Sequence, residues 1–232
     1  MSLPFVAVVI SVVYSLLYDF HGSTATHCKV NNILPSISAA IGRTPQRYIW
    51  RILISLHAAP RFIIAAAYYG WHKQVHVGSN QTTYLFLVKV AVFLHVLENF
   101  MLVLLTCVSS NENKDIHENS FILFIITSWA YMLLTIGLCK WARKHSSERN
   151  RKIDTESYRL KKIYAFINII SFSLATYLYF RHNWYCEPYV YSWFGVCEYI
   201  TVITNILFHG TAIKDFDEYS ASFVLTELLK KR

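Results

Sequence analysis

The segment 48–71 is long and apolar enough to cross a bilayer, yet it contains Arg51, His57 and Arg61. A helix rising about 1.5 Å per residue would be about 36 Å long here, enough for a hydrocarbon core of about 30 Å. Arg61 would then lie near mid-membrane, where an arginine costs about 3 kcal/mol on insertion scales. We therefore expect Arg61 to face the interior of a helix bundle and to find a partner on another helix.

His57 and Arg61 are four residues apart and share a helix face, with Pro60 between them to loosen the local hydrogen-bond ladder. The alternative to a functional pair is a structural ion pair beside a hydrogen-bonded histidine. The sequence leaves both interpretations open.

Composition places the chain among polytopic membrane proteins, because 54% of its 232 residues are apolar and only 16% are charged. The net charge of +8 is concentrated in the stretch 142–162 and in the tail. This pattern fits the positive-inside rule better than a nucleic-acid-binding face, so no nucleic acid partner is expected. The five cysteines lack zinc-ribbon spacing, and no phosphate loop, HExxH or GxSxG motif is present.

We predict an all-α fold, a six-helix transmembrane bundle that forms one domain with both termini in the cytosol. The predicted spans are about 3–20, 48–71, 84–108, 119–141, 163–180 and 189–213, followed by a cytosolic tail at 214–232. The basic stretch 142–162 sets this orientation and puts the loops 21–46, 109–118 and 181–189 in the lumen. The first run could instead be a removed signal peptide, but the basic segment that begins such a signal is missing.

Glu98 is the first candidate partner for Arg61, and His95 lies on the same face as Glu98. In the last span Glu198, Asn205 and His209 fall within about 40° of one another, which predicts an inward polar stripe. Two acids against one arginine would leave one acid free to carry protons beside a histidine. A structural polar core is the competing interpretation; a proton-coupled transporter is less favoured, because paired Gly/Pro breaks are missing.

Cys28 and Cys186 would lie in the first and last lumenal loops, where a disulfide between them would clamp the loops over the bundle. Cys107 is a rival partner at the same membrane face. A metal site from His21, His27 and Cys28 lacks a suitably spaced fourth ligand, so no metal is expected. The glycosylation sequon at 80–82 would lie in the cytosol and stay unmodified.

Several motifs resemble those of the post-GPI attachment to proteins factor 2 family, which is related to the DRAM-type membrane proteins. They include Thr24-Ala25-Thr26-His27-Cys28, Leu34-Pro35-Ser36-Ile37-Ser38, Pro45-Gln46-Arg47-Tyr48, Trp50-Arg51, Pro60-Arg61, Glu98-Asn99, Ile116-His117-Glu118-Asn119, Tyr179-Phe180-Arg181-His182-Asn183, Tyr185-Cys186-Glu187 and Phe208-His209. The match covers nearly the whole chain in the same order. It departs at the loop 72–83, the basic loop and the tail.

The resemblance implies a six-span protein of the secretory pathway, in the Golgi membrane or the endoplasmic reticulum, that remodels the lipid of GPI anchors. The implied step is reacylation of lyso-GPI with a saturated chain. The implied partners are GPI lipid or GPI-anchored proteins and membrane phospholipid, and no cofactor is implied.

Two hypotheses follow from the resemblance. In the first the chain is an acyltransferase, although the HxxxxD motif is missing; a histidine takes a proton from the glycerol hydroxyl while an arginine holds the anchor phosphate. In the second it binds or presents the lipid, or supports a lipid-remodelling enzyme as its partner. The candidate residues are His57, His182, Glu98 and Glu198 for catalysis and Arg51, Arg61, Arg181, Asn205 and His209 for lipid or phosphate binding.

Overall fold

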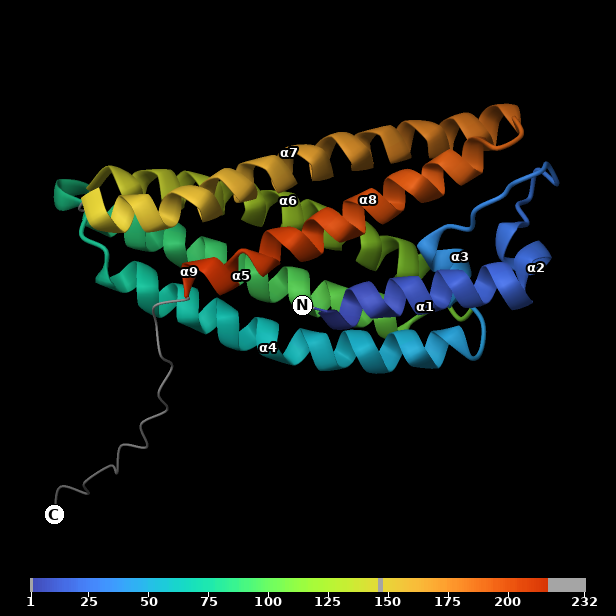
Figure 1. Ribbon diagram of the computed structural model, residues 1–232, viewed down its shortest axis with the longest axis horizontal. Helices are drawn as coiled ribbons and strands as arrows, with labels where there is room; N and C mark the ends of the chain where they lie inside the picture. The colour runs from blue at the N-terminus through green and yellow to red at the C-terminus, as the bar shows by residue number, and fades with distance from the viewer. Residues whose placement is uncertain (1, 146–147, 217–232) are drawn as a thin grey trace, which may run out of the picture.

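The computed structural model describes residues 2–145 and 148–216, and this part of the chain contains helices and no strand. Five long helices lie side by side along one axis, and the shorter helices lie beside them or near their ends (Figure 1). The elements are α1 (Ser2–Tyr18), α2 (Phe20–Thr24), α3 (Ile37–Ile41), α4 (Gln46–Gln74), the 3₁₀ turn η1 (Gly78–Asn80), α5 (Gln81–Cys107), α6 (Lys114–His145), α7 (Glu148–Tyr185), α8 (Val190–Gly210) and α9 (Ala212–Asp215).

Five helical segments in the described ranges are long and apolar enough to cross a membrane, so the chain is a multi-pass membrane protein. They are Gln46–Gln74, Gly78–Cys107, Lys114–His145, Thr155–Tyr185 and Val190–Asp215. The helix α1 is apolar but has only 17 residues, about 26 Å of helix, which is shorter than the others. Figure 1 shows α1 lying beside one half of α4 and beginning near the middle of the bundle.

Two helices extend into stretches that the sequence suggested would be loops. α6 begins at Lys114, where the side chain of Asn113 accepts a hydrogen bond from the Ile116 amide at 3.0 Å and so caps the helix. α7 begins at Glu148, inside the basic stretch. Lysine, arginine and glutamate are good helix formers, so these helices continue beyond their apolar segments. The predicted tail lies outside the described residues from 217 onward.

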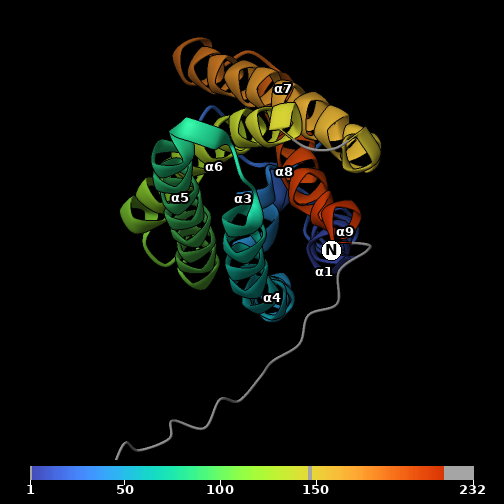
Figure 2. The same ribbon diagram turned by 90° about the vertical axis from the view of Figure 1, so that its left-hand side faces the viewer.

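Viewed along its long axis, the bundle places α7 outermost, over α6 and α8 (Figure 2). The most extensive contacts are between α7 and α8, α5 and α6, α4 and α5, and α1 and α4. α4 and α8 do not pack closely along their backbones, so long side chains must bridge them.

One end of the bundle carries the connections 19–45, 108–113 and 186–189, and we call it the disulfide end. The long connection 19–45 is fastened to α8 there. The hydroxyl of Ser192 accepts hydrogen bonds from the amides of Ile33 at 2.8 Å and Leu34 at 3.3 Å. Gly195 lets the loop come this close, because a Cβ at that position would lie 2.8 Å from the carbonyl oxygen of Pro35.

Candidate functional site

Four polar side chains from three helices meet inside the bundle, and we call them the central cluster: Arg61, Glu98, Asn205 and His209. Arg61 of α4 lies 3.1 Å from the carboxylate of Glu98 on α5. From α8, His209 Nε2 lies 2.9 Å from the same carboxylate oxygen, and Asn205 donates to it at 3.0 Å. Glu98 is completely buried and Arg61 is 2% exposed. The predicted pairing of Arg61 with Glu98 is therefore confirmed, and the arginine faces protein.

The hydrogen bonding of His209 depends on whether its Nε2 carries a proton. Its Nε2 lies 2.7 Å from an Arg61 nitrogen and 2.9 Å from Glu98, and Nε2 either accepts from the arginine or donates to the carboxylate. The second carboxylate oxygen of Glu98 and the Nε of Arg61 are buried without a hydrogen-bond partner among the described residues. Each such atom costs about 1–3 kcal/mol. The cluster therefore retains unused hydrogen-bonding capacity in the interior.

Pro60 lies within the continuous helix α4, one residue before Arg61, and cannot donate a backbone hydrogen bond there. Near this position the side-chain amide of Asn99 on α5 donates to the carbonyl of Ala58 at 2.9 Å. In lipid, side chains of neighbouring helices satisfy backbone groups that a proline loosens. His57 is buried one turn before Arg61, on the inward face of α4. Pro60 thus lies within the same helical turn as the buried polar residues of α4.

A stack of aromatic rings extends the central cluster towards the end opposite the disulfide. The ring of His209 stacks on Tyr131 with centroids 5.4 Å apart, and His95 stacks on Tyr131 at 4.5 Å. Beside the stack is a small cavity of about 10 Å³, room for one water at most. The motif comparison missed Tyr131 and the buried Ser128, which accepts from Asn205 at 2.8 Å. Ser128 and Tyr131 are polar residues three positions apart in an otherwise apolar helix, and this spacing could have indicated a shared polar face.

The structure separates Glu198 from the central cluster. The carboxylate of Glu198 accepts a hydrogen bond from the backbone amide of Ile37 at 2.7 Å, at the start of α3. The expectation that two acids would face Arg61 at comparable depth is therefore wrong for the described residues. Glu198 lies about 16 Å along α8 from His209, because eleven residues of helix separate them. The predicted polar stripe does face inward, since Glu198, Asn205 and His209 are all buried.

The two other candidate arginines lie at the disulfide end, and each has an acidic partner. Arg51 donates to the carbonyl of Cys107 at 2.6 Å and forms an ion pair with Glu112. Two hydrogen bonds from Ser109, together with Arg51, lower the pKa of Glu112 to about 2. Arg181 is half-exposed and pairs with Glu187 at 2.6 Å.

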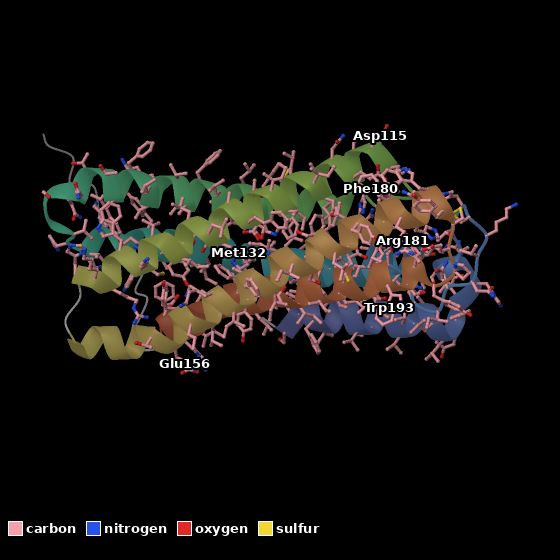
Figure 3. All side chains as sticks on the ribbon, turned by 90° about the horizontal axis from the view of Figure 1, so that it is seen from above. Asp115, Met132, Glu156, Phe180, Arg181 and Trp193 are labelled. Carbon is pink, nitrogen blue, oxygen red and sulfur yellow. A yellow bond between two sulfur atoms is a disulfide. The ribbon has the colours of Figure 1, made fainter. Side chains whose placement is uncertain are left out.

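Arg181 lines an open groove of about 510 Å³ together with exposed aromatic side chains, among them Phe180 and Trp184. Figure 3 shows Phe180 and Arg181 at the end of the bundle where the disulfide sulfurs lie. Bonding to Arg181 lowers the pKa of Glu187. Of the three arginines proposed to hold phosphate, Arg181 is thus the one a ligand reaches most easily.

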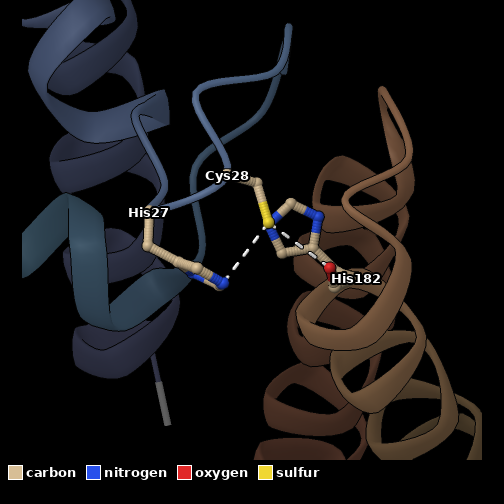
Figure 4. Close-up of side chains that lie close together, drawn as sticks. All are labelled: His27, Cys28 and His182. Atoms are coloured by element: carbon tan, nitrogen blue, oxygen red, sulfur yellow. Dashed lines mark hydrogen bonds between the residues drawn. The ribbon is translucent and has the colours of Figure 1, made fainter.

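A disulfide joins Cys28, in the long connection, to Cys186, just after α7, with Cα atoms 5.2 Å apart. It is the pairing that the sequence favoured over Cys107, which is a free, exposed cysteine. Two histidines lie beside its Cys28 sulfur (Figure 4). His27 Nε2 lies 3.3 Å from the Cys28 sulfur, and the His182 ring packs edge-on against the His27 ring at 5.7 Å.

A second buried charged site at the opposite end was also missed by sequence reasoning. Lys161 of α7 is 1% exposed and pairs with Asp215 of α9. The hydroxyl of Tyr68 on α4 donates to the same carboxylate. Two polar contacts therefore connect α4 to the end of the chain's helical part. Arg61 contacts His209 of α8, and Tyr68 contacts Asp215 of α9.

The chain was compared with known families and proteins. Residues 1–219 match the model of the Frag1/DRAM/Sfk1/Cwh43P N-terminal domain. A Xenopus tropicalis protein named Acyltransferase PGAP2 is 43% identical over 93% of this chain and 84% of its own length. A Caenorhabditis elegans protein named Post-GPI attachment to proteins factor 2 is 41% identical over 97% of this chain and 85% of its own length. The chain matches no solved structure.

Proposed function

This chain belongs to the Frag1/DRAM/Sfk1/Cwh43P family, and we propose that it acts in the maturation of GPI anchors. We further propose that its step is the reacylation of lyso-GPI with a saturated fatty acid. The relatives' names support this proposal, since one is called an acyltransferase and the other a post-GPI attachment factor. The site of action is the Golgi membrane, or alternatively the membrane of the endoplasmic reticulum.

The observation that carries the proposal is the histidine–carboxylate pair of His209 and Glu98 beside the buried cation Arg61. With Nε2–H donated to Glu98, the lone pair of His209 is on Nδ1. Nδ1 takes the proton of the glycerol hydroxyl as the hydroxyl oxygen attacks the ester carbonyl of a phospholipid. The ester bond breaks, and the departing lysophospholipid oxygen takes up that proton. Arg61 stabilises the negative charge that develops on the carbonyl oxygen.

Lipid reaches this site sideways in the proposed mechanism, between α4 and α8. The two helices are joined there by side chains rather than by close backbone packing. Membrane phospholipid is the proposed acyl donor, because its chains lie in the bilayer beside α4 and α8, whereas polyanionic acyl-CoA would have to leave water to reach this buried site. Arg61 is the proposed contact for the anchor phosphate, because that phosphate is bonded to the same glycerol as the reacting hydroxyl. Arg181 and Arg51 lie at the disulfide end, and 19 residues, about 28 Å of helix, separate the start of α8 there from His209, so neither holds this phosphate while His209 reaches the hydroxyl.

The proposed topology has six spans, with α1 as the first, and both termini in the cytosol. The support is the charge distribution: eight lysines and arginines lie between residues 142 and 162, next to the end opposite the disulfide. The disulfide end then faces the lumen, an oxidising compartment that suits the bond between Cys28 and Cys186.

Purified protein in vesicles, given lyso-GPI and a phospholipid with a labelled saturated chain, tests this function. We expect labelled GPI to form, and His209→Ala to slow its formation by roughly 10²–10⁴-fold, the usual contribution of a general base. His57→Ala and His182→Ala belong in the same panel, since either would replace His209 as the base if it alone abolished turnover. His76→Ala is the matched control, because His76 is exposed in the connection between α4 and α5.

The second candidate function is binding or presenting the GPI lipid to a separate remodelling enzyme. Two observations favour it: Arg51, Arg61 and Arg181 each already have an acidic partner, and the cavity beside the central cluster, about 10 Å³, is too small for a lipid chain. Tight binding of lyso-GPI without turnover by the purified protein would support this function and reject catalysis.

A further inference from the structure

Two histidines and a disulfide converge at the disulfide end without serving the proposed acyl transfer. Potential ligand atoms of His27, Cys28 and His182 all lie within 4.8 Å of one another. Cys186 adds a fourth, because its sulfur is bonded to that of Cys28. Figure 4 shows His27 and His182 approaching the Cys28 sulfur from two separate segments of the chain.

His182 is the unusual member of this group. It is completely buried, and neither ring nitrogen makes a hydrogen bond of good geometry among the described residues. The backbone of Glu187 interacts with the ring as a weak hydrogen-bond partner. The adjacent disulfide offers little, since its sulfurs carry no proton to donate and are weak acceptors. The carbonyl oxygen of His182 merely contacts the Cys28 sulfur at 3.4 Å. A buried imidazole with at most one weak hydrogen-bond partner for its two nitrogens, placed beside sulfur, retains the capacity to bind a ligand.

We propose that this corner is a zinc site that forms when the disulfide is reduced, with His27, Cys28, His182 and Cys186 as the four ligands. Two thiolates and two imidazoles form the common Cys₂His₂ set of structural zinc. Zinc bond lengths of about 2.0–2.3 Å place tetrahedral donor atoms about 3.3–3.8 Å apart.

The local backbone suits this coordination. His27 Nε2 and the Cys28 sulfur are already 3.3 Å apart. His182 and Cys186 are four residues apart at the end of α7, where the Cys186 amide donates to the His182 carbonyl at 2.9 Å. Cys186 lies just past the helix with a φ of +50°, and its bond to Cys28 places its sulfur beside the same group as His182. His27 is exposed, so the metal has a route from solvent.

The chemistry balances with a dithiol as the reductant. The dithiol gives two electrons and two protons to the Cys28–Cys186 bond, yielding two thiols, and itself becomes a disulfide. Zinc then binds both sulfurs and releases their two protons. The metal would hold the connection 19–45 to the end of α7 in place of the disulfide, so the loops stay fastened in either redox state.

The test uses the full chain in detergent micelles, reduced with a phosphine that is then removed under inert gas, and titrated with Co²⁺ followed by Zn²⁺. We expect one equivalent of cobalt to give the thiolate charge-transfer band and the d–d bands of a tetrahedral site, and zinc to bleach both. Protein with the disulfide intact should give neither band. His27→Ala, an exposed position, should weaken binding at least about tenfold, since even the loss of an outer-shell partner costs about 10–100-fold.

Two matched controls are available. Cys107→Ser removes a free, exposed cysteine and His21→Ala removes an exposed histidine of the same connection, and both should bind cobalt as the parent chain does. The double variant Cys28→Ser/Cys186→Ser should lose the charge-transfer band. The proposal is wrong if the reduced parent chain gives no such band, if that double variant keeps it, or if His27→Ala leaves the affinity unchanged.

Discussion

Replacing Glu98 by glutamine should destabilise the bundle strongly, because it leaves Arg61 buried and charged without an anion. Glu98 is 0% exposed and Arg61 is 2% exposed, so solvent screens neither. Removing one partner of a buried ion pair costs about 3–5 kcal/mol. The glutamine carbonyl can still accept from Asn205, so the loss reports mainly on charge. For chains of 150–250 residues this corresponds to a fall in Tm of about 6–20 °C.

The assay is thermal unfolding of purified protein in detergent, followed by the loss of the monodisperse peak in size-exclusion chromatography. The double variant Arg61→Met/Glu98→Gln provides the decisive comparison. It removes the stranded charge along with the carboxylate, so it should melt well above Glu98→Gln alone. Glu156→Gln is the control, because the Glu156–Lys214 pair is solvent-exposed and should contribute little.

Two results would refute this reasoning. If Glu98→Gln melted within 2 °C of the parent chain, about the shift for 1 kcal/mol, the buried pair would not stabilise the bundle as argued. The single variant Arg61→Met is measured as well. If adding Arg61→Met lowered the Tm of Glu98→Gln by as much as it lowers the Tm of the parent chain, the two charges would not be coupled.

Two further predictions concern the disulfide end. Hydrogen bonds from Ser109 hold the pKa of Glu112 at about 2 against an ordinary 4.5, so the stabilising contribution of Glu112 is complete above pH 4.5 and is lost as the pH falls towards 2. Over this pH range the Tm of Glu112→Gln should therefore fall less than the Tm of the parent chain. Equal slopes of Tm against pH would contradict the assignment. Ile33→Thr creates a glycosylation sequon at the exposed Asn31, and we expect a glycan there in cells but none at the native sequon of Asn80. A gel shift that a glycosidase removes detects a glycan at either site. A glycan at Asn80 would reverse the proposed orientation.

Much of this protein follows from its sequence. Apolar segments of this length indicate helices in lipid, because a helix satisfies its backbone hydrogen bonds within the segment. The arginine inside one such segment requires a partner within the bundle, which predicted the pairing of Arg61 with Glu98. The period of the helix predicted that Glu198, Asn205 and His209 would all face inward. Each of these inferences depends only on local geometry and on the cost of exposing polar groups to lipid.

Which polar groups meet was decided by tertiary structure. Glu198 and Glu98 are both buried acids, yet one caps the start of α3 and the other faces Arg61. That difference depends on the depth and rotation of α8 relative to α5, which periodicity within one helix does not specify. The same holds for Tyr131, for the Lys161–Asp215 pair and for the two histidines beside the disulfide. Residues so distant in sequence come together only when separate helices pack, and the sequence of each helix encodes its inward face but not its neighbour.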